Sequence, residues 1–269
     1  MLKRIIGLLL FLPLVSFAQG WLPMGGRSNS MANATVALSD AWAFHHNPGA
    51  LAEVKQQTFG VSYENRFLLK ELQSQGFVYV QPLKTGVFSV GAQLTGFNLY
   101  RTQRIGAGYS LQLSEKFSAG VQLNYQGIKL PDNYGSRNTV TAELGFLAKL
   151  TEDWKIGFSI FNLGRAKLAD FKDERFTTLM RLGTSYTFSK KVLVSAEVEK
   201  NVNFALRVKA GMDYQLRDNF YFRAGLATQP IELSFGFGYK FKQFQCDLGS
   251  SYHQVLGWSP HISFTYSRK

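Results

Sequence analysis

The sequence predicts an all-β protein: a transmembrane antiparallel β-barrel of about 14 strands, with an N-terminal hatch or plug segment. Three observations lead to this prediction. Most of the stretch from 56 to 269 alternates apolar residues with polar or small ones, as half-buried strands do. Many alternating segments run 10 to 14 residues, which is long for strands of soluble proteins. The links between them alternate between very short polar turns and longer loops, as in outer-membrane barrels.

Composition excludes several other classes of protein. The chain has 269 residues, of which 45% are hydrophobic, 14% aromatic and 18% charged, unlike a disordered chain. Its single cysteine, Cys246, excludes a disulfide scaffold. No apolar run reaches the ~18–20 residues that a membrane-spanning helix needs. The formal net charge is +12, but the basic residues are scattered. This pattern favours solvated turns, or contact with anionic lipid head groups, over nucleic-acid binding.

The first residues have the pattern of a secretory signal peptide. Lys3 and Arg4 precede an apolar run at 5–17, and small residues at Ser16 and Ala18 place the cleavage before residue 19. The predicted parts are a signal peptide at 1–18, an N-terminal hatch at 19–55 and the barrel at 56–269.

The alternation divides the barrel region into fourteen segments. One of the clearest runs from Phe204 to Tyr214, with every second residue apolar. The count is even, as single-chain bacterial barrels require. No helical segment could cover so many apolar strand faces, whereas lipid could, and closure would satisfy the backbone hydrogen bonds. The predicted strands are 56–66, 74–83, 86–99, 104–113, 116–128, 138–150, 153–162, 176–188, 191–200, 203–215, 219–227, 230–241, 243–252 and 258–267.

The same alternation assigns several charged residues to the lumen. If the valines of the segment at 191–200 face lipid, Glu197 and Glu199 face inward. The next strand then places Arg207 and Lys209 inward, and opposite charges on neighbouring strands can pair. Two interpretations of this lumen charge network remain open. It either stiffens a closed lumen or forms a polar path that selects solutes.

Residues 19–55 lack the two-residue period and are rich in Ala, Asn, Ser and Gly. Because this segment precedes the barrel, we expect it to fold into the lumen as a plug. Arg27 and Asp40 could pair inside it, and Asn47 with Pro48 would form a turn. A plug held against the wall and a gate are the two alternatives.

The hatch segment resembles that of the FadL-like outer-membrane family, including its PorV-like branch. The resemblance covers about 30 residues, and the barrel adds a similarity of architecture. The chain departs from the family in its single Asp40 and in its short loops. The matching residues are Gly25, Gly26, Arg27, Ser28, Met31, Ala34, Ala37, Asp40, Ala43, Asn47, Pro48 and Leu51.

The resemblance implies a non-enzymatic barrel in the outer membrane of a Gram-negative bacterium. Short loops argue against a fatty-acid groove and favour a PorV-like accessory or partner subunit of an outer-membrane assembly, with type IX secretion as one candidate. The alternative is FadL-like passive transport of small hydrophobic compounds. Expected partners are outer-membrane lipid and lipopolysaccharide, proteins of such a complex, or a hydrophobic small molecule, and no nucleic acid.

No residues suggest catalysis, a cofactor or a metal site. The adjacent His45 and His46 would point apart on an extended segment and have no cluster of carboxylates nearby. None of the four histidines belongs to a nucleophile motif. The sequence therefore predicts a protein that is not an enzyme and binds no cofactor.

Overall fold

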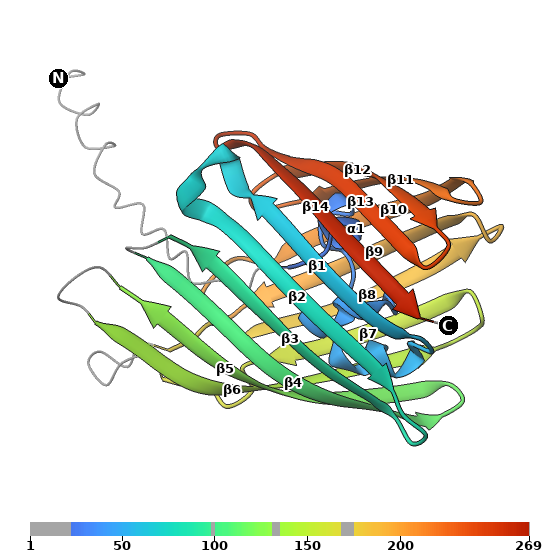
Figure 1. Cartoon of the computed structure of the whole chain (residues 1–269), viewed down its shortest axis with the longest axis horizontal. Helices are drawn as coiled ribbons and strands as arrows, with labels where there is room; N and C mark the ends of the chain where they lie inside the picture. The colour runs from blue at the N-terminus through green and yellow to red at the C-terminus, as the bar shows by residue number, and fades with distance from the viewer. Residues whose placement is uncertain (1–22, 98–99, 131–134, 168–174, 269) are drawn as a thin grey trace, which may run out of the picture.

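A closed antiparallel barrel of fourteen strands dominates the computed structural model, which describes residues 23–97, 100–130, 135–167 and 175–268 (Figure 1). Consecutive strands pair with one another, and β1 (Gln57–Asn65) closes the ring by pairing with β14 (Gly257–Arg268). Closure gives every strand a paired neighbour on both sides, as a sheet in lipid requires. The predicted fold class, including its strand number, is confirmed.

The remaining strands follow in chain order around the ring. They are β2 (Gln73–Pro82), β3 (Val87–Gly96), β4 (Arg101–Ser114), β5 (Phe117–Lys129), β6 (Ser136–Lys149), β7 (Trp154–Phe161), β8 (Leu179–Phe188), β9 (Val192–Asn201), β10 (Arg207–Arg217), β11 (Phe220–Ala227), β12 (Glu232–Phe241) and β13 (Phe244–His253). Short helices are α1 (Gly26–Ser30), η3 (Ala41–His45), η4 (Pro48–Glu53), η5 (Arg66–Leu68) and η6 (Lys70–Leu72). None of the helices in the described ranges is long and apolar enough to cross a membrane. The predicted signal peptide lies outside those ranges.

The two ends of the barrel differ. At the end that holds the start of β1 and the end of β14, neighbouring strands are joined by tight turns, such as 115–116 and 242–243. We call this the turn end; it lies at the right in Figure 1. The opposite end, the loop end, carries the longer links, including 66–72 and 162–178. In bacterial barrels the short turns face the periplasm and the loops face outward.

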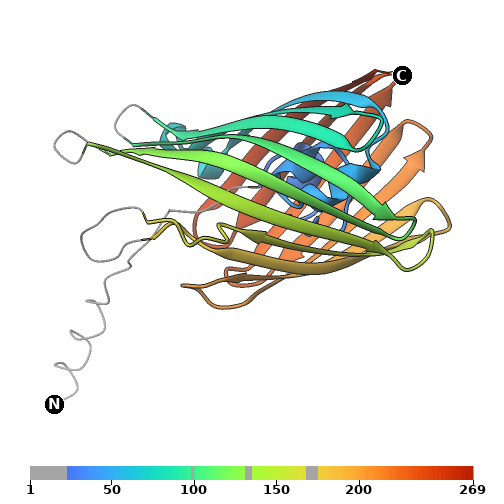
Figure 2. The same cartoon turned by 90° about the horizontal axis from the view of Figure 1, so that it is seen from below.

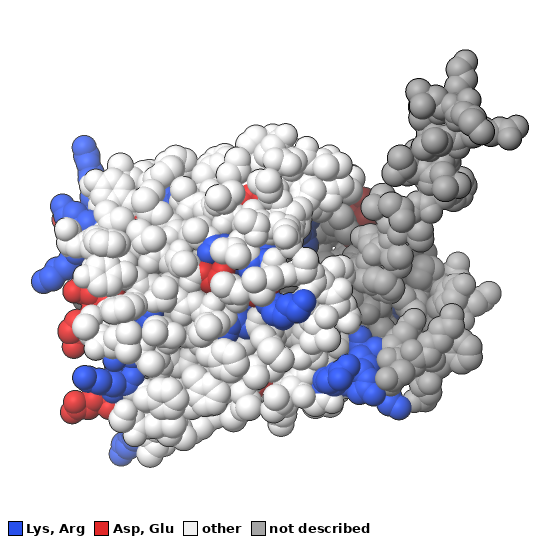
Figure 3. Space-filling model, turned by 180° about the vertical axis from the view of Figure 1, so that it is seen from behind, with Lys and Arg blue, Asp and Glu red and all other residues white. Residues whose placement is uncertain are grey.

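The outer surface of the barrel is apolar. Along β5, Leu123 points outward with 63% of its surface exposed, whereas Asn124 points inward and is fully buried. Ile105 on β4 and Val140 on β6 extend the same exposed apolar band. Figure 3 shows broad uncharged areas on one face, with many charged side chains at the turn end, others toward the loop end and a small group in the middle of the face. Such a continuous apolar surface suits contact with lipid rather than water.

The wall is not equally high all round. Strands β4, β5 and β6 have 14, 13 and 14 residues, whereas β7 has only 8. In Figure 2 the long strands reach beyond the others at the loop end. The β6–β7 ladder ends at the pair Glu143–Phe161. On the same side of β6, the next residue, Ala142, accepts a backbone hydrogen bond at its carbonyl from Leu163 N at 3.0 Å.

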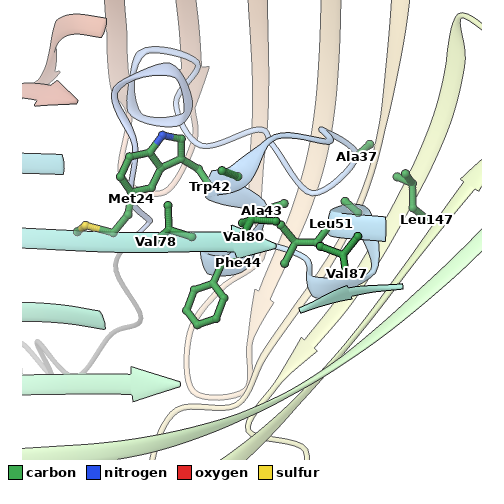
Figure 4. Packing of buried hydrophobic residues seen from close by; sticks show 12 residues of the cluster. Met24, Ala37, Trp42, Ala43, Phe44, Leu51, Val78, Val80, Val87 and Leu147 are labelled. Atoms are coloured by element: carbon green, nitrogen blue, oxygen red, sulfur yellow. The ribbon is translucent and has the colours of Figure 1, made fainter. Parts of the chain in front are cut away.

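The apolar core lies inside the barrel, between the segment 23–55 and the wall. Trp42, Phe44 and Leu51 of this segment are buried against Val78 and Leu147 of the strands (Figure 4). This lumen segment, which we call the hatch, therefore packs as a small folded unit rather than as a loose chain. The sequence predicted its place but not this core.

Candidate functional site

The beginning of the hatch sits against strands β13, β14 and β1. Gly26 N donates to Ser263 Oγ at 2.9 Å, and Gly25 N donates to Ser62 Oγ at 3.3 Å. Gly25 has a φ of +98°, and a Cβ there would lie 2.5 Å from the Trp42 ring. Glycine is therefore required at this position, both for its conformation and for the close approach of the indole.

Arg27 connects the hatch to the wall. Its Nη1 donates to Asp40 Oδ2 at 2.9 Å, and its Nε donates to Asp213 Oδ2 on β10 at 2.8 Å. Asp213 also accepts from Arg223, which in turn donates to Asp247 at 2.6 Å. The pairing of Arg27 with Asp40 that the sequence suggested is thus one step of a longer chain of charges.

Ser28 and Met31 lie in the buried interior of the hatch. The Ser28 carbonyl accepts hydrogen bonds from the backbone N–H groups of Met31 and Asn33. Met31 packs directly on the wall, since a Cβ added at Gly211 would lie 2.8 Å from its Cβ. The hatch can approach the strands this closely because glycine faces it.

The end of the hatch is held by Asn47 and Pro48. Asn47 Oδ1 accepts from Gly49 N at 3.0 Å and caps η4, while its Nδ2 donates to Phe146 O on β6 at 2.9 Å. Ser110 Oγ on β4 donates to Pro48 O at 2.6 Å. This turn is therefore bonded to the barrel wall through its backbone and its side-chain amide.

The lumen charge network gathers on β8, β9 and β10. Lys209 Nζ lies 3.0 Å from Glu197 and 2.6 Å from Glu199, and Arg181 Nε lies 3.0 Å from Glu199. The side chains of Lys209 and Glu197 are each only 1% exposed. Arg207 does not join this group; it pairs with Glu232 on β12 at 2.7 Å.

Glu197 also binds the backbone of the hatch. Its Oε2 accepts from the backbone N–H groups of Thr35 and Val36, both at 2.8 Å. A carboxylate that receives two backbone donors and a lysine is fully partnered although it is buried. The arrangement links charge pairing in the wall to the position of the hatch.

Sequence reasoning missed three further ion pairs of the lumen. Arg104 on β4 donates to Glu143 on β6 at 2.9 Å. Glu53 at the end of η4 accepts from Lys149 at 2.6 Å and from Lys155 at 2.5 Å. The inward parity of these strand residues was available in the sequence. Their partners could not be predicted, because the Arg104–Glu143 pair depends on strand register and tilt and the two lysine pairs depend on where the hatch places Glu53.

A cavity of about 50 Å³ lies on the loop side of the hatch. Phe161 and Ile128 give it apolar walls, and Arg104 lies over the Phe161 ring at 5.4 Å from its centroid. The cavity is also lined by Gln93, Thr102, Gln103, Gln126, Gly127, Phe176 and Thr177. It sits next to the short wall, since Phe161 is the last residue of β7.

Asn162 shapes the start of the long loop beside this cavity. It is buried, its φ is +56°, and its Nδ2 donates to Phe176 O at 2.8 Å. Its carbonyl accepts from Thr178 Oγ1 at 3.2 Å. Through its side-chain amide and its backbone carbonyl, Asn162 thereby connects the two ends of the loop at 162–178.

The two hatch histidines are buried and serve packing. Burial, reinforced by the guanidinium of Arg104, lowers the pKa of His45 to about 3. Burial, with Arg181 nearby, lowers the pKa of His46 well below its usual value. Their Nε2 atoms lie 3.3 Å from Phe77 O and 3.1 Å from Met24 O. The described residues contain no cluster of three metal-ligating side chains.

We expect acid to destabilise the hatch through these histidines. Both are neutral when folded, so stability is complete above the unfolded pKa of about 6.5 and is lost as pH falls below it. Between pH 7 and pH 5 the loss is about 2 kcal/mol for each histidine. Urea unfolding in micelles at both pH values measures it. His46→Gln should reduce the pH dependence, and His253→Asn, which changes a loop-end residue outside the hatch, should leave it unchanged.

The fold and the filled lumen define a plugged fourteen-stranded barrel. No protein-family model and no curated protein sequence matches the chain. The CymD monoaromatic hydrocarbon channel is similar in structure, with 15% identity, a TM-score of 0.68, and coverage of 93% of this chain and 98% of that one. The Ralstonia pickettii toluene transporter TbuX has 13% identity, a TM-score of 0.66, and coverage of 91% and 98%. The Pseudomonas putida toluene transporter TodX has 14% identity, a TM-score of 0.64, and coverage of 90% and 97%.

These similarities confirm the FadL-like fold, since a further similar structure is a Pseudomonas aeruginosa FadL homologue. They do not support the PorV-like branch. The prediction of a PorV-like accessory subunit, with type IX secretion as its setting, is wrong: the similar structures are channels and transporters for hydrophobic compounds. That finding concerns those proteins and shows the fold of this chain. It is also consistent with a protein that is not an enzyme.

Proposed function

We propose that this protein is a non-enzymatic outer-membrane barrel for passive uptake of small hydrophobic compounds. The observation that carries the proposal is the partly apolar cavity between the hatch and the loop end, beside the low wall at β7. Its fold is shared with channels named for monoaromatic hydrocarbons, which supports the same class of substrate here.

The cavity has to widen before it can hold such a compound. Its volume of about 50 Å³ is well below the roughly 150 Å³ of a cavity that binds benzene. Arg104 and Phe161, stacked beside the cavity, are the side chains whose movement would enlarge it. The proposed mechanism is therefore binding on the loop side of the hatch with displacement of these two side chains.

The proposed route to the membrane crosses the end of β7. On the side of β6 that faces β7, the described residues contain no strand paired with the stretch 136–142, and Leu163 at the start of the loop contacts it there. A hydrophobic compound leaving the cavity there would enter lipid without passing the charged groups of the hatch. We place the protein in the outer membrane, surrounded by its lipid and lipopolysaccharide, with the turn end toward the periplasm.

Uptake of toluene by intact cells tests the proposal. We expect cells that produce the protein in their outer membrane to take up toluene faster than cells without it. Thr177→Trp places an indole in the cavity, so we expect it to reduce uptake to the level of cells that lack the protein. Glu115→Trp adds the same side chain at a turn and should keep full uptake. Equal uptake with and without the protein, over a panel of hydrophobic compounds, would refute the proposal.

A further inference from the structure

The outer surface of strands β4, β5 and β6 changes from apolar to polar to positively charged toward the loop end. Residues that pair across the three strands form rungs on one face of the sheet. Toward the loop end, the first two rungs are apolar: Ala107–Leu123–Ala142 and Ile105–Tyr125–Val140. The third rung is polar and consists of Gln103, Gly127 and Asn138. The fourth rung, nearest the loop end, carries two cations and consists of Arg101, Lys129 and Ser136. From Ile105 to Arg101 is about 13 Å along the strand.

A hollow lies on the outer surface at the polar rung, beside Gly127. The neighbouring amides converge over it: a Cβ at Gly127 would lie 2.8 Å from Gln103 Nε2 and 2.8 Å from Asn138 Oδ1. Of the described residues that line this hollow, Arg101 and Lys129 carry positive charge and none carries negative charge. The hollow is thus lined by amide groups and two cationic side chains on the outer surface of the barrel.

An apolar groove continues from this hollow along the outer wall. It is lined by the small side chains of Ala92 and Ala107 together with Ile105, Leu123 and Tyr125. Tyr125 lines both the groove and the hollow, so the two are continuous. The groove therefore lies on the lipid-facing surface, on the membrane-centre side of the cations.

We propose that this surface binds one phosphate-bearing lipid of the outer leaflet. Its phosphate lies in the hollow between Arg101 and Lys129, and an acyl chain lies in the groove over Ala107. Charge complementarity selects the headgroup, and the order of the rungs matches a lipid, with its charge outermost and its chain toward the membrane centre. The inference depends on the barrel standing in a membrane but not on which compound it transports.

Native mass spectrometry of the full-length protein in detergent, titrated with phosphorylated lipid A, tests the headgroup site. Arg101→Gln with Lys129→Gln should weaken the binding by about tenfold or more. The matched control, Lys70→Gln with Lys200→Gln, removes two exposed cations from other parts of the loop end and should bind as the unmodified protein does. Equal weakening in both double variants would mean general charge attraction and would overturn the proposal.

A second pair of variants tests the acyl chain. Ala107→Phe fills the groove and should weaken lipid A binding, whereas Ala196→Phe, on the exposed face of β9, should not. Inorganic phosphate should compete poorly with the lipid. If inorganic phosphate bound as well as lipid A and Ala107→Phe had no effect, the site would be one for free phosphate and the lipid assignment would be wrong. Toluene uptake by the same variants separates this outcome from failure of the transport function.

Discussion

Gly145→Val is expected to push the end of the hatch off the barrel wall. A Cβ at Gly145 would meet Asn47 Oδ1, and would lie 2.7 Å from Gly49 N and 2.8 Å from Pro48 Cδ. Gly49 N is a backbone atom, Pro48 Cδ belongs to a ring, and Asn47 Oδ1 is fixed by its hydrogen bond as the cap of η4. None of these atoms can rotate away from the new side chain, so the hatch itself has to move. Overpacking of this kind costs about 1–3 kcal/mol, and more where the contact is backbone.

The measurement is passage of small hydrophilic solutes together with heat stability. We expect Gly145→Val to lower the melting temperature and to admit solutes that the unmodified barrel excludes. Gly164→Val is the control, because a Cβ at Gly164 meets nothing within 4 Å. An intact barrier and an unchanged melting temperature in Gly145→Val would show that the hatch does not seal the lumen at this contact.

Lys209→Met should be the most destabilising change in the lumen charge network. It leaves Glu197 and Glu199 without their shared lysine, and Glu197 is buried. Removing one partner of a buried ion pair costs about 3–5 kcal/mol. Because Glu197 also accepts from Thr35 and Val36, we expect the hatch to loosen as well.

Urea unfolding in micelles measures the loss, and limited proteolysis of the hatch measures the loosening. The double variant Lys209→Met with Glu199→Gln should recover part of the stability, because it removes one of the two carboxylate charges that lose their lysine partner. Lys200→Met, on the exposed face of the same sheet, should change stability by about 0.5 kcal/mol or less. A Lys209→Met protein as stable as the unmodified one would contradict the importance of this network.

The barrel was predictable because lipid imposes a simple rule on every strand. Outward residues have to be apolar and inward ones need not be, so alternation alone places Leu123 outside and Glu197 inside. Strand ends were less predictable: the segment expected at 176–188 begins as a strand only at Leu179. Asn162 and the loop it ties explain the difference, since their hydrogen bonds replace the ladder there.

The site was predictable only in part. Parity places Arg207 in the lumen but cannot choose its partner. Arg207 lies opposite Glu199 in the β9–β10 ladder, yet its guanidinium pairs with Glu232, two strands away. The cavity is formed by residues of β3, β4, β5, the end of β7 and the loop after it, so no local pattern signals it. The hatch core around Trp42 and Phe44 escaped prediction because its apolar residues are sparse and follow no period.

The two faces of the barrel wall differ in how many amino-acid substitutions they tolerate. The outer face asks only for apolar character, so one apolar side chain can replace another there without loss. The inner face is less tolerant, since glycines such as Gly145 lie directly against the hatch backbone. The outward-facing half of the residues in each strand can therefore change among apolar types while the fold is kept. Identities of 13% to 15% beside TM-scores of 0.64 to 0.68 show that one fold accommodates very different sequences, as this freedom allows.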